Sequence, residues 1–160
     1  MRKAGILLCL LLVLTGCGGG TVPQSAPDFK IKVVGGGGER WLGKTITLSE
    51  LRGKAVVIHF TASWCYACKE IFNALTQNYP GVFVMGIGVL DRKANIIDFI
   101  RAHNMPAPVG YDEDGSIARN YRVNTLPLTV FIDREGKIVE RVVGVIEGDA
   151  LKELMDRITG

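Results

Sequence analysis

Two cysteines, Cys65 and Cys68, stand three residues apart directly after an apolar run, and this junction most constrains how the chain can fold. The run at 55–60 is nearly continuous in apolar side chains, which is typical of a strand covered on both faces. Beyond it the apolar residues follow helical spacing until Pro80-Gly81, at Cys68, Ile71, Phe72, Leu75 and Tyr79. The sequence therefore predicts a buried strand that leads into a helix opened by two thiols.

The rest of the chain reads as alternating strands and helices. Further strands are predicted at 29–34, 45–48, 82–89, 107–111, 128–132 and 137–143. The first two flank a run of four glycines, a predicted turn or flexible loop, as an N-terminal hairpin, and the last two pair antiparallel across the turn at 133–136. Further helices are predicted at 93–103, 116–121 and 149–158. This order predicts an α/β protein with a mixed sheet.

The N-terminus has the pattern of a lipoprotein signal peptide. Met1-Arg2-Lys3 is positively charged, residues 6–14 are apolar but too short to span a bilayer comfortably, and Leu14-Thr15-Gly16-Cys17 follows. This pattern resembles the bacterial lipobox, which is cut before its cysteine. The resemblance implies a signal peptide over 1–16 and a diacylated Cys17, with an ordinary secretory signal as the alternative. Because Cys9 would be removed, Cys65 and Cys68 would be the thiols left to pair.

Charge gives little reason to expect a nucleic-acid partner. The formal net charge of +3 falls to +1 without residues 1–16, which hold two of the 19 basic residues and none of the 16 acidic ones. No basic run with interleaved aromatic residues is present, so nucleic acid is excluded as a partner. Residues 17–27 are rich in Gly, Pro, Ser and Thr and predict a flexible tether, and residues 28–160 have the length of one compact domain.

Five stretches of the chain together carry a family resemblance. They are Ala26-Pro27-Asp28-Phe29, the stretch Leu48 to Lys54, the stretch Phe60 to Cys68, the stretch Tyr121 to Pro127 and the stretch Phe131 to Ile138. From about residue 26 to residue 160 the chain resembles the TlpA/ResA-type thiol–disulfide oxidoreductases, which are extracytoplasmic and often membrane-tethered. The resemblance implies a thioredoxin-like three-layer α/β/α sandwich with a mixed central sheet, an N-terminal β-hairpin and a central βα-type insertion.

The two cysteines are predicted to exchange disulfides. At a helix N-terminus the free backbone N–H groups and the macrodipole favour negative charge, so the pKa of Cys65 should be lowered and Cys65 should be the nucleophile. Cys68, one turn deeper, would resolve the mixed disulfide. A structural disulfide and half of a zinc site are the alternatives. Zinc usually needs four ligands, and besides carboxylates the chain adds only His59 and His103, so no metal site is predicted.

Pro127 and Leu126 are predicted to face the cysteines. In thioredoxin folds the matching proline is cis and leaves the preceding backbone free to pair with an extended substrate, a contact that Leu126 would supply. The alternative is a trans turn proline before a strand. Trp64 and Tyr66 are predicted to contact substrate as an apolar rim, with plain core packing as the alternative for Trp64.

His59 and Glu70 depart from the family pattern. His59 lies six residues before Cys65, where thioredoxins place a buried acid that helps to deprotonate the second cysteine. It is interpreted either as a proton relay or as a buried, neutral, hydrogen-bonded histidine. The family commonly has Glu three residues after the second cysteine, but that position is Ile71 here. Glu70 is rotated by about 100° and is predicted to be a surface charge.

The resemblance implies an extracytoplasmic, lipid-anchored enzyme that reduces protein disulfides, on the periplasmic side if the host has an outer membrane. Apocytochrome c, as in cytochrome c maturation by relatives, is one implied substrate. A membrane thiol reductant is the implied electron donor, because no nucleotide or flavin motif is present and the Cys65–Cys68 pair is the only redox group. The alternatives are a thiol peroxidase, which would carry proline at position 59 and Thr or Ser at position 62, and a copper-binding chaperone, which usually spaces its cysteines by three residues.

Overall fold

The computed structural model describes residues 24–77 and 79–160. The predicted signal peptide, the predicted lipidation site Cys17 and most of the predicted tether lie outside these residues. Among the helices of the described part of the chain, none has the length and apolar character needed to cross a membrane.

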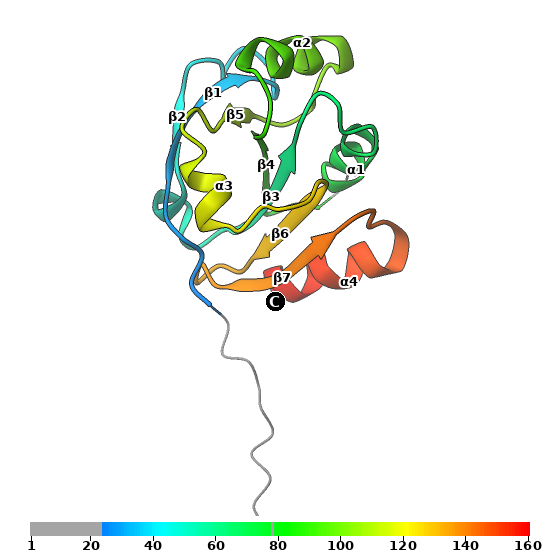
Figure 1. The fold of residues 1–160 in the computed structure, drawn as a ribbon. Helices are drawn as coiled ribbons and strands as arrows, with labels where there is room; N and C mark the ends of the chain where they lie inside the picture. Colours follow the sequence, from blue (N-terminus) through cyan, green and yellow to red (C-terminus); the bar gives the residue numbers. More distant parts are fainter. Residues whose placement is uncertain (1–23, 78) are drawn as a thin grey trace, which may run out of the picture.

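A seven-stranded mixed sheet forms the centre of the molecule (Figure 1). The strands lie in the order β2-β1-β5-β4-β3-β6-β7. β3 pairs with β4 and β4 with β5 in parallel, and the other neighbours are antiparallel, including the predicted β1–β2 and β6–β7 hairpins. The strand bounds are β1 Lys30–Gly35, β2 Thr45–Thr47, β3 Ala55–Thr61, β4 Val82–Gly88, β5 Val109–Tyr111, β6 Leu128–Ile132 and β7 Ile138–Val143.

Helices cover both faces of this sheet, which confirms the predicted three-layer α/β/α architecture. On one face, α1 (Cys68–Leu75) packs against β3, α4 (Gly148–Thr159) against β3 and β6, and α2 (Lys93–His103) against β1 and β5. The other face carries the short helix α3 (Ser116–Asn120) and a 3₁₀ turn at Leu48–Leu51. α2 and β5 form the predicted central insertion between β4 and α3.

Strand β3 is the most enclosed element, because it lies between β4 and β6 and beneath helices on both sides. All seven of its residues are buried, as the apolar run predicted. Its alternating side chains divide between the two cores, so Val56 and Ile58 face α3 whereas Val57 faces α1 and α4. His59 and Thr61 are the polar exceptions in β3, and they lie toward the end that leads into the cysteines.

The glycine run after β1 is a tightly packed turn. A Cβ atom added at Gly36 would lie 2.2 Å from the carbonyl oxygen of Ala107, and one at Gly37 would lie 2.9 Å from the nitrogen of Pro108. Both glycines also have φ near +70°, at 77° and 66°, which disfavours any other residue. The run therefore allows the N-terminal hairpin to approach the loop between α2 and β5.

Two predicted boundaries are wrong. The first helix was expected to run from Cys65 to Tyr79, but α1 begins at Cys68 and ends at Leu75. At its end the backbone changes to a tighter turn, in which the N–H groups of Thr76 and Gln77 donate to the oxygens of Asn73 and Ala74, both at 3.3 Å. Tyr79 lies beyond the helix, although it still packs against the same core.

The folded unit also begins before residue 28, where the tether was expected to end. Ser25 forms an isolated antiparallel bridge with Lys137, and the backbone N–H of Ala26 donates to the oxygen of Gly136 at 2.9 Å. The N–H of Ile138 in turn donates to the oxygen of Gln24 at 2.8 Å. Composition alone suggested a flexible segment, but the open edge beside the β6–β7 turn supplies partners for its backbone.

Candidate active site

Cys65 and Cys68 form a disulfide at the junction of β3 and α1, with their Cα atoms 5.4 Å apart. Two hydrogen-bonded turns shape this junction. The N–H of Cys65 donates to the oxygen of Ala62 at 3.1 Å, and the N–H of Cys68 donates to the oxygen of Cys65 at 3.1 Å. Because Cys68 is the first residue of α1, the sulfur of Cys65 lies beside the N-terminal end of the helix instead of within it.

The two sulfur-bearing residues differ in their access to solvent. Cys68 is fully buried, and its sulfur lies 3.9 Å from the backbone oxygen of Phe60. Cys65 is 5% exposed and borders an open cavity of about 300 Å³. A partner can therefore reach Cys65 first, as the sequence predicted for the nucleophile.

The peptide bond between Leu126 and Pro127 is cis, as the resemblance implied. Leu126 is half-buried and packs against the small cluster formed by Ala62 and the two cysteines. Among the described residues, neither backbone group of Leu126 bonds to another backbone group, and the pairing of β6 with β3 begins only at Leu128. The backbone beside the disulfide is therefore free to pair with an extended segment of another molecule.

His59 lies beneath the disulfide in the interior. Its Nδ1 is 3.0 Å from the hydroxyl oxygen of Thr129, its antiparallel partner on β6, and its ring packs against Phe72 of α1. Its Nε2 has no hydrogen-bond partner among the described residues, although the backbone of Cys68 is close enough to favour the charged form. Complete burial outweighs that influence and lowers the pKa of His59 to about 4. The imidazole is therefore neutral at physiological pH.

Five exposed apolar side chains belong to the segments that flank the disulfide and the cis-proline, and we call them the apolar rim: Trp64, Tyr66, Leu90, Val143 and Val145. Trp64 is 60% exposed and Tyr66 100% exposed, so Trp64 is not a core residue. The indole Nε1 of Trp64 donates to the backbone oxygen of Leu90 at 3.3 Å. On the opposite side, the N–H of Gly144, which lies between the two valines, donates to the backbone oxygen of Pro127 at 2.9 Å. Exposed apolar side chains gathered in this way mark a protein-binding surface.

Sequence reasoning missed part of this rim. Leu90 follows β4, Val143 is the last residue of β7 and Val145 follows it, so all three are distant from the cysteines in the sequence. No local pattern distinguishes them from core residues at the ends of buried strands. Only the order of strands in the sheet places these residues beside the disulfide.

Asp91 is a second residue that sequence reasoning missed. Its carboxylate accepts hydrogen bonds from the backbone N–H of Ser63 at 2.7 Å and from the side chain of Asn95 at 2.9 Å. Burial alone would raise the pKa of Asp91, but these bonds and one from the N–H of Arg92 lower it below its ordinary value. Asp91 thus fastens the loop before the first cysteine to the start of α2. The only local signal is its place shortly before the helix predicted at 93–103, which is typical of a capping residue.

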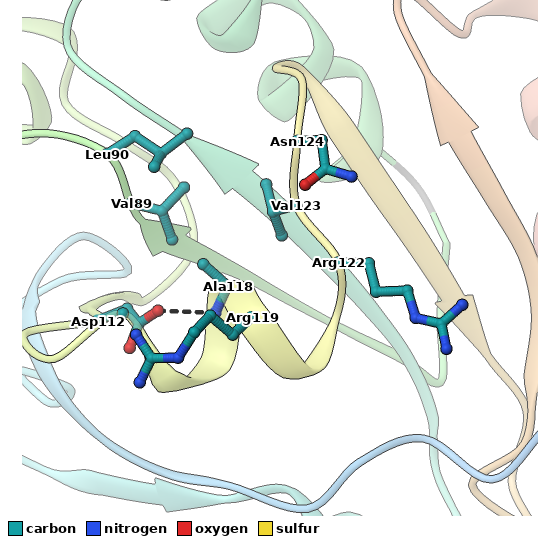
Figure 2. Close-up of a pocket in the computed structure, with 9 residues that line it drawn as sticks. Val89, Leu90, Asp112, Ala118, Arg119, Arg122, Val123 and Asn124 are labelled. Carbon is teal, nitrogen blue, oxygen red and sulfur yellow. Dashed lines mark hydrogen bonds between the residues drawn. The ribbon is translucent and has the colours of Figure 1, made fainter.

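A cavity of about 410 Å³ continues from the rim toward α3 (Figure 2). Val89 and Leu90 lie on one side of it, and Ala118 and Arg119 of α3 on another, with Asp112 bonded to the N–H of Ala118 at 2.7 Å. The chain that leads toward the cis-proline completes the wall with Arg122, Val123 and Asn124. This groove therefore gives the docking surface a depth beyond the rim.

The remaining departures from the family pattern lie as expected. Ile71 is buried at 2% exposure, whereas Glu70 is exposed and lies 3.6 Å from the ammonium of Lys69. No carboxylate thus occupies the position beneath the disulfide where the family commonly has one. His103 is exposed at the end of α2, with its ring 4.7 Å from that of Phe99.

Disulfide exchange is the chemistry that an accessible and a buried sulfur beside a free backbone edge can perform. Together with the sheet order, it defines the class of thioredoxin-like thiol–disulfide oxidoreductases.

Comparisons with known proteins lead to the same class. The AhpC/TSA family matches residues 22–141. Thiol-disulfide oxidoreductase ResA of Bacillus subtilis is 31% identical over 140 residues, covering 84% of this chain and 74% of that protein. The protein of the same name from Bacillus anthracis is 28% identical over 179 aligned positions, covering 99% of each chain. The chain belongs to the AhpC/TSA family and, within it, to the ResA-type thiol–disulfide oxidoreductases.

Solved structures agree with this placement. A putative thiol:disulfide interchange protein DsbE from Chlorobium tepidum superposes with a TM-score of 0.72 at 26% identity, covering 86% of this chain and 97% of that one. An exposed lipoprotein thioredoxin from Streptococcus pneumoniae gives a TM-score of 0.63 at 28% identity, covering 82% and 99%. The predicted fold and the predicted oxidoreductase activity are thereby confirmed.

Proposed function

We propose that this protein is an extracytoplasmic reductase of protein disulfides that works through a mixed disulfide on Cys65, resolved by Cys68. The observation that carries this proposal is the unequal burial of the two residues beside a free backbone edge at Leu126. An attacking sulfur must be reachable by a partner, and a resolving sulfur must be reachable only by the first. The 5% and 0% exposed fractions of Cys65 and Cys68 fit this division.

In the reduced enzyme, the Cys65 thiolate attacks one sulfur of the substrate disulfide, forming a mixed disulfide and releasing the other substrate sulfur as a thiolate. Cys68 then loses its proton and attacks the sulfur of Cys65. The Cys65–Cys68 disulfide forms, the mixed disulfide breaks, and the fully reduced substrate leaves. Two electrons pass from the enzyme to the substrate, so a dithiol donor must reduce the enzyme again.

The substrate segment is proposed to lie across Pro127 with its backbone paired to that of Leu126. The apolar rim would bury apolar side chains on either side of the substrate cysteine, with Trp64 and Tyr66 nearest to the attacking sulfur. Aromatic residues of this kind often supply a large share of binding energy in protein interfaces.

His59 is proposed to be a structural histidine and not the base that deprotonates Cys68. An ordinary thiol has a pKa of about 8.5, whereas burial lowers that of His59 to about 4. Moving a proton from such a thiol to this imidazole would cost roughly 6 kcal/mol at that difference. Its hydrogen bond with Thr129 instead secures β3 against β6 directly below the disulfide.

The proposal also covers where the enzyme is located and which molecules it reacts with. Lipidation of Cys17 after removal of residues 1–16 would hold the enzyme on the outer side of the cytoplasmic membrane or in the periplasm. A structural relative from Streptococcus pneumoniae is itself described as an exposed lipoprotein. The electron donor would be a membrane thiol reductant, and apocytochrome c is the proposed substrate among oxidised proteins.

The rival functions lack support in this site. A thiol peroxidase of related fold would have proline and Thr or Ser where this chain has His59 and Ala62, and both of these residues are fully buried. A copper-binding chaperone would need its cysteines reduced and a further ligand within reach. Titration of the reduced protein with Cu(I), in parallel with insulin reduction, separates that function from catalysis.

Trapping tests the proposal directly. Cys68→Ser expressed in the native host should accumulate proteins joined to Cys65 by a disulfide, because the intermediate cannot be resolved. Cys65→Ser serves as the matched control and should trap none. A Cys68→Ser protein that captures no partner would contradict the mechanism, and mass spectrometry of captured proteins would show whether an apocytochrome c is among them.

A further inference from the structure

The open cavity that Cys65 borders is a space beside the disulfide separate from the cis-proline. This cavity of about 300 Å³ lies between the first turn of α1 and the end of α2, and neither Leu126 nor Pro127 lines it. Figure 1 shows α1 and α2 on the same side of the sheet. Its lining residues are Ser63, Cys65, Tyr66, Lys69, Glu70, Phe99 and His103.

The walls of this cavity carry charge of both signs within reach of one sulfur. Lys69 and Glu70 of α1 lie 3.6 Å apart, with side chains that are 38% and 75% exposed. An exposed ion pair of this kind contributes little to stability, so the pair can open and each of the two groups can contact a ligand instead. His103 adds an imidazole from α2, held in place by edge-to-face contact with Phe99 at 4.7 Å.

The substrate cysteine of a polypeptide would make no use of these charges. A cysteine within a chain has its amino and carboxyl groups tied up in peptide bonds, and its backbone would pair with Leu126 on the other side of the disulfide. A volume near 300 Å³ instead lies at the lower end of the range for small-molecule sites. Both observations favour a small zwitterion whose carboxylate meets Lys69 and His103 and whose ammonium meets Glu70.

We propose that this cavity binds low-molecular-weight disulfides that bear free α-amino and α-carboxylate groups, of the cystine type, and presents them to Cys65. This inference rests on the exchange reaction proposed above and extends it to a second class of substrate. The Cys65 thiolate attacks one sulfur of the small disulfide, so that one amino-acid thiolate leaves and the other half remains bound to Cys65. Cys68 then loses its proton and closes the Cys65–Cys68 disulfide, which releases the second thiolate. The enzyme dithiol is oxidised and the small disulfide is reduced by two electrons.

Single-turnover oxidation of the pre-reduced protein, followed by tryptophan fluorescence, tests this site without any added reductant. The probes are cystine, cystamine, which has the amines but no carboxylates, and 2-hydroxyethyl disulfide, which has neither. Each rate is divided by the rate of the same probe with dithiothreitol, which removes differences in intrinsic reactivity. Cystine should then exceed both other probes by about tenfold, as expected for two or three exposed charge contacts.

Substitutions of the charged residues in the cavity wall test whether they cause the preference for cystine. Lys69→Ala, Glu70→Gln and His103→Ala should each lower the ratio of the cystine rate to the 2-hydroxyethyl disulfide rate by about threefold. Lys93→Ala removes a lysine at the other end of α2, where it pairs with Glu113 at 3.3 Å, and should leave this ratio unchanged. Equal normalised rates for the three probes, or a ratio that survives all three substitutions, would overturn the inference.

Failure of this inference is distinguishable from failure of the proposed function. Insulin reduction by the wild-type protein, measured in parallel, reports on protein disulfides alone. A protein that reduces insulin without preferring cystine would retain the proposed function and lose the second substrate class. A protein that prefers cystine but does not reduce insulin would show the reverse.

Discussion

The two ends of one disulfide lie in opposite surroundings. On the Cys65 side, the apolar rim and two open cavities leave side chains free for contact, and Tyr66 is completely exposed. On the Cys68 side, Cys68 and His59 are both fully buried, and His59 is held by Thr129. The contrast teaches that the residues available to contact substrates and the residues that hold the disulfide in place lie on different sides of the same pair of cysteines. Changes at the rim should alter which molecules react, whereas changes below Cys68 should alter stability.

The cysteines themselves provide the largest test of this contrast. Cys65→Ser should abolish insulin turnover and form no mixed disulfide. Cys68→Ser should still form one mixed disulfide per molecule but turn over at least about a thousandfold more slowly than the wild type. Insulin reduction and gel shift of the mixed disulfide check this difference. Equal labelling of both variants by a protein disulfide would show that burial does not assign the roles.

His59 should make the buried side sensitive to mild acid. Its pKa is lowered to about 4 in the folded protein from 6.5, so the unfolded chain binds its proton first as the pH falls. The free energy of unfolding should drop by roughly 3 kcal/mol between pH 6.5 and pH 4 on this account. His59→Asn should flatten that fall in urea unfolding curves, while His103→Asn, a substitution at an exposed histidine, should not. A wild-type fall that persists in His59→Asn would contradict this role.

Asp91 lies at the border of the two sides, and its effect should be intermediate. Asp91→Ala removes the acceptor of the Ser63 N–H and should lower the free energy of unfolding by about 1–2 kcal/mol. Because the folded pKa of Asp91 is lowered, this stabilisation is present above the unfolded pKa of about 3.9 and is lost as the pH falls through the folded value. Thermal unfolding at pH 7 and pH 3 measures both effects.

Asp98→Asn alters an exposed acid of α2, the helix that follows Asp91, and is the control; it should change stability by less than about 0.5 kcal/mol. If Asp91→Ala loses no more stability than this control at pH 7, then the Ser63 loop is held by other contacts.

The rim should give the smallest effect and only on binding. Tyr66→Ser removes a fully exposed ring, so stability should stay within about 0.5 kcal/mol. The KM for insulin should rise severalfold, about 1 kcal/mol of binding, with kcat little changed. Leu42→Ser alters another exposed apolar residue, 62% exposed but outside the rim, and should leave KM unchanged. Equal effects of the two substitutions would show that the rim does not bind substrate.

Much of the fold follows from local patterns in the sequence. The apolar run at 55–60, the helical spacing of α2 and α4 and the turn at 133–136 each depend on neighbours in the chain, and each was placed within about two residues of its position. The predicted start of the first helix was wrong because Cys65 lies in two hydrogen-bonded turns and not in a turn of the helix. The predicted start of the folded unit was also wrong, because the backbone pairing of Ser25 depends on Lys137, more than 100 residues further along the chain.

The site divides in the same way. The cysteines, Pro127 and His59 belong to motifs that sequence alone exposes, and the structure brings them together. Leu90 and Asp91 come from the end of β4, and the two rim valines from the end of β7. Their place beside the disulfide follows from the strand order, which no single stretch of sequence encodes.

The attachment of residues 24–26 to the β6–β7 turn sets a direction for the whole molecule. That turn lies at the end of β6 opposite to Leu128, whereas Leu128 pairs with Phe60 at the end of β3 that carries the disulfide. A lipid on Cys17 would leave only seven residues before Gln24, a reach of at most about 25 Å. A domain anchored in this way would stand with its reactive end pointing outward, and the proposed membrane donor would have to project past the body of the domain to deliver its electrons.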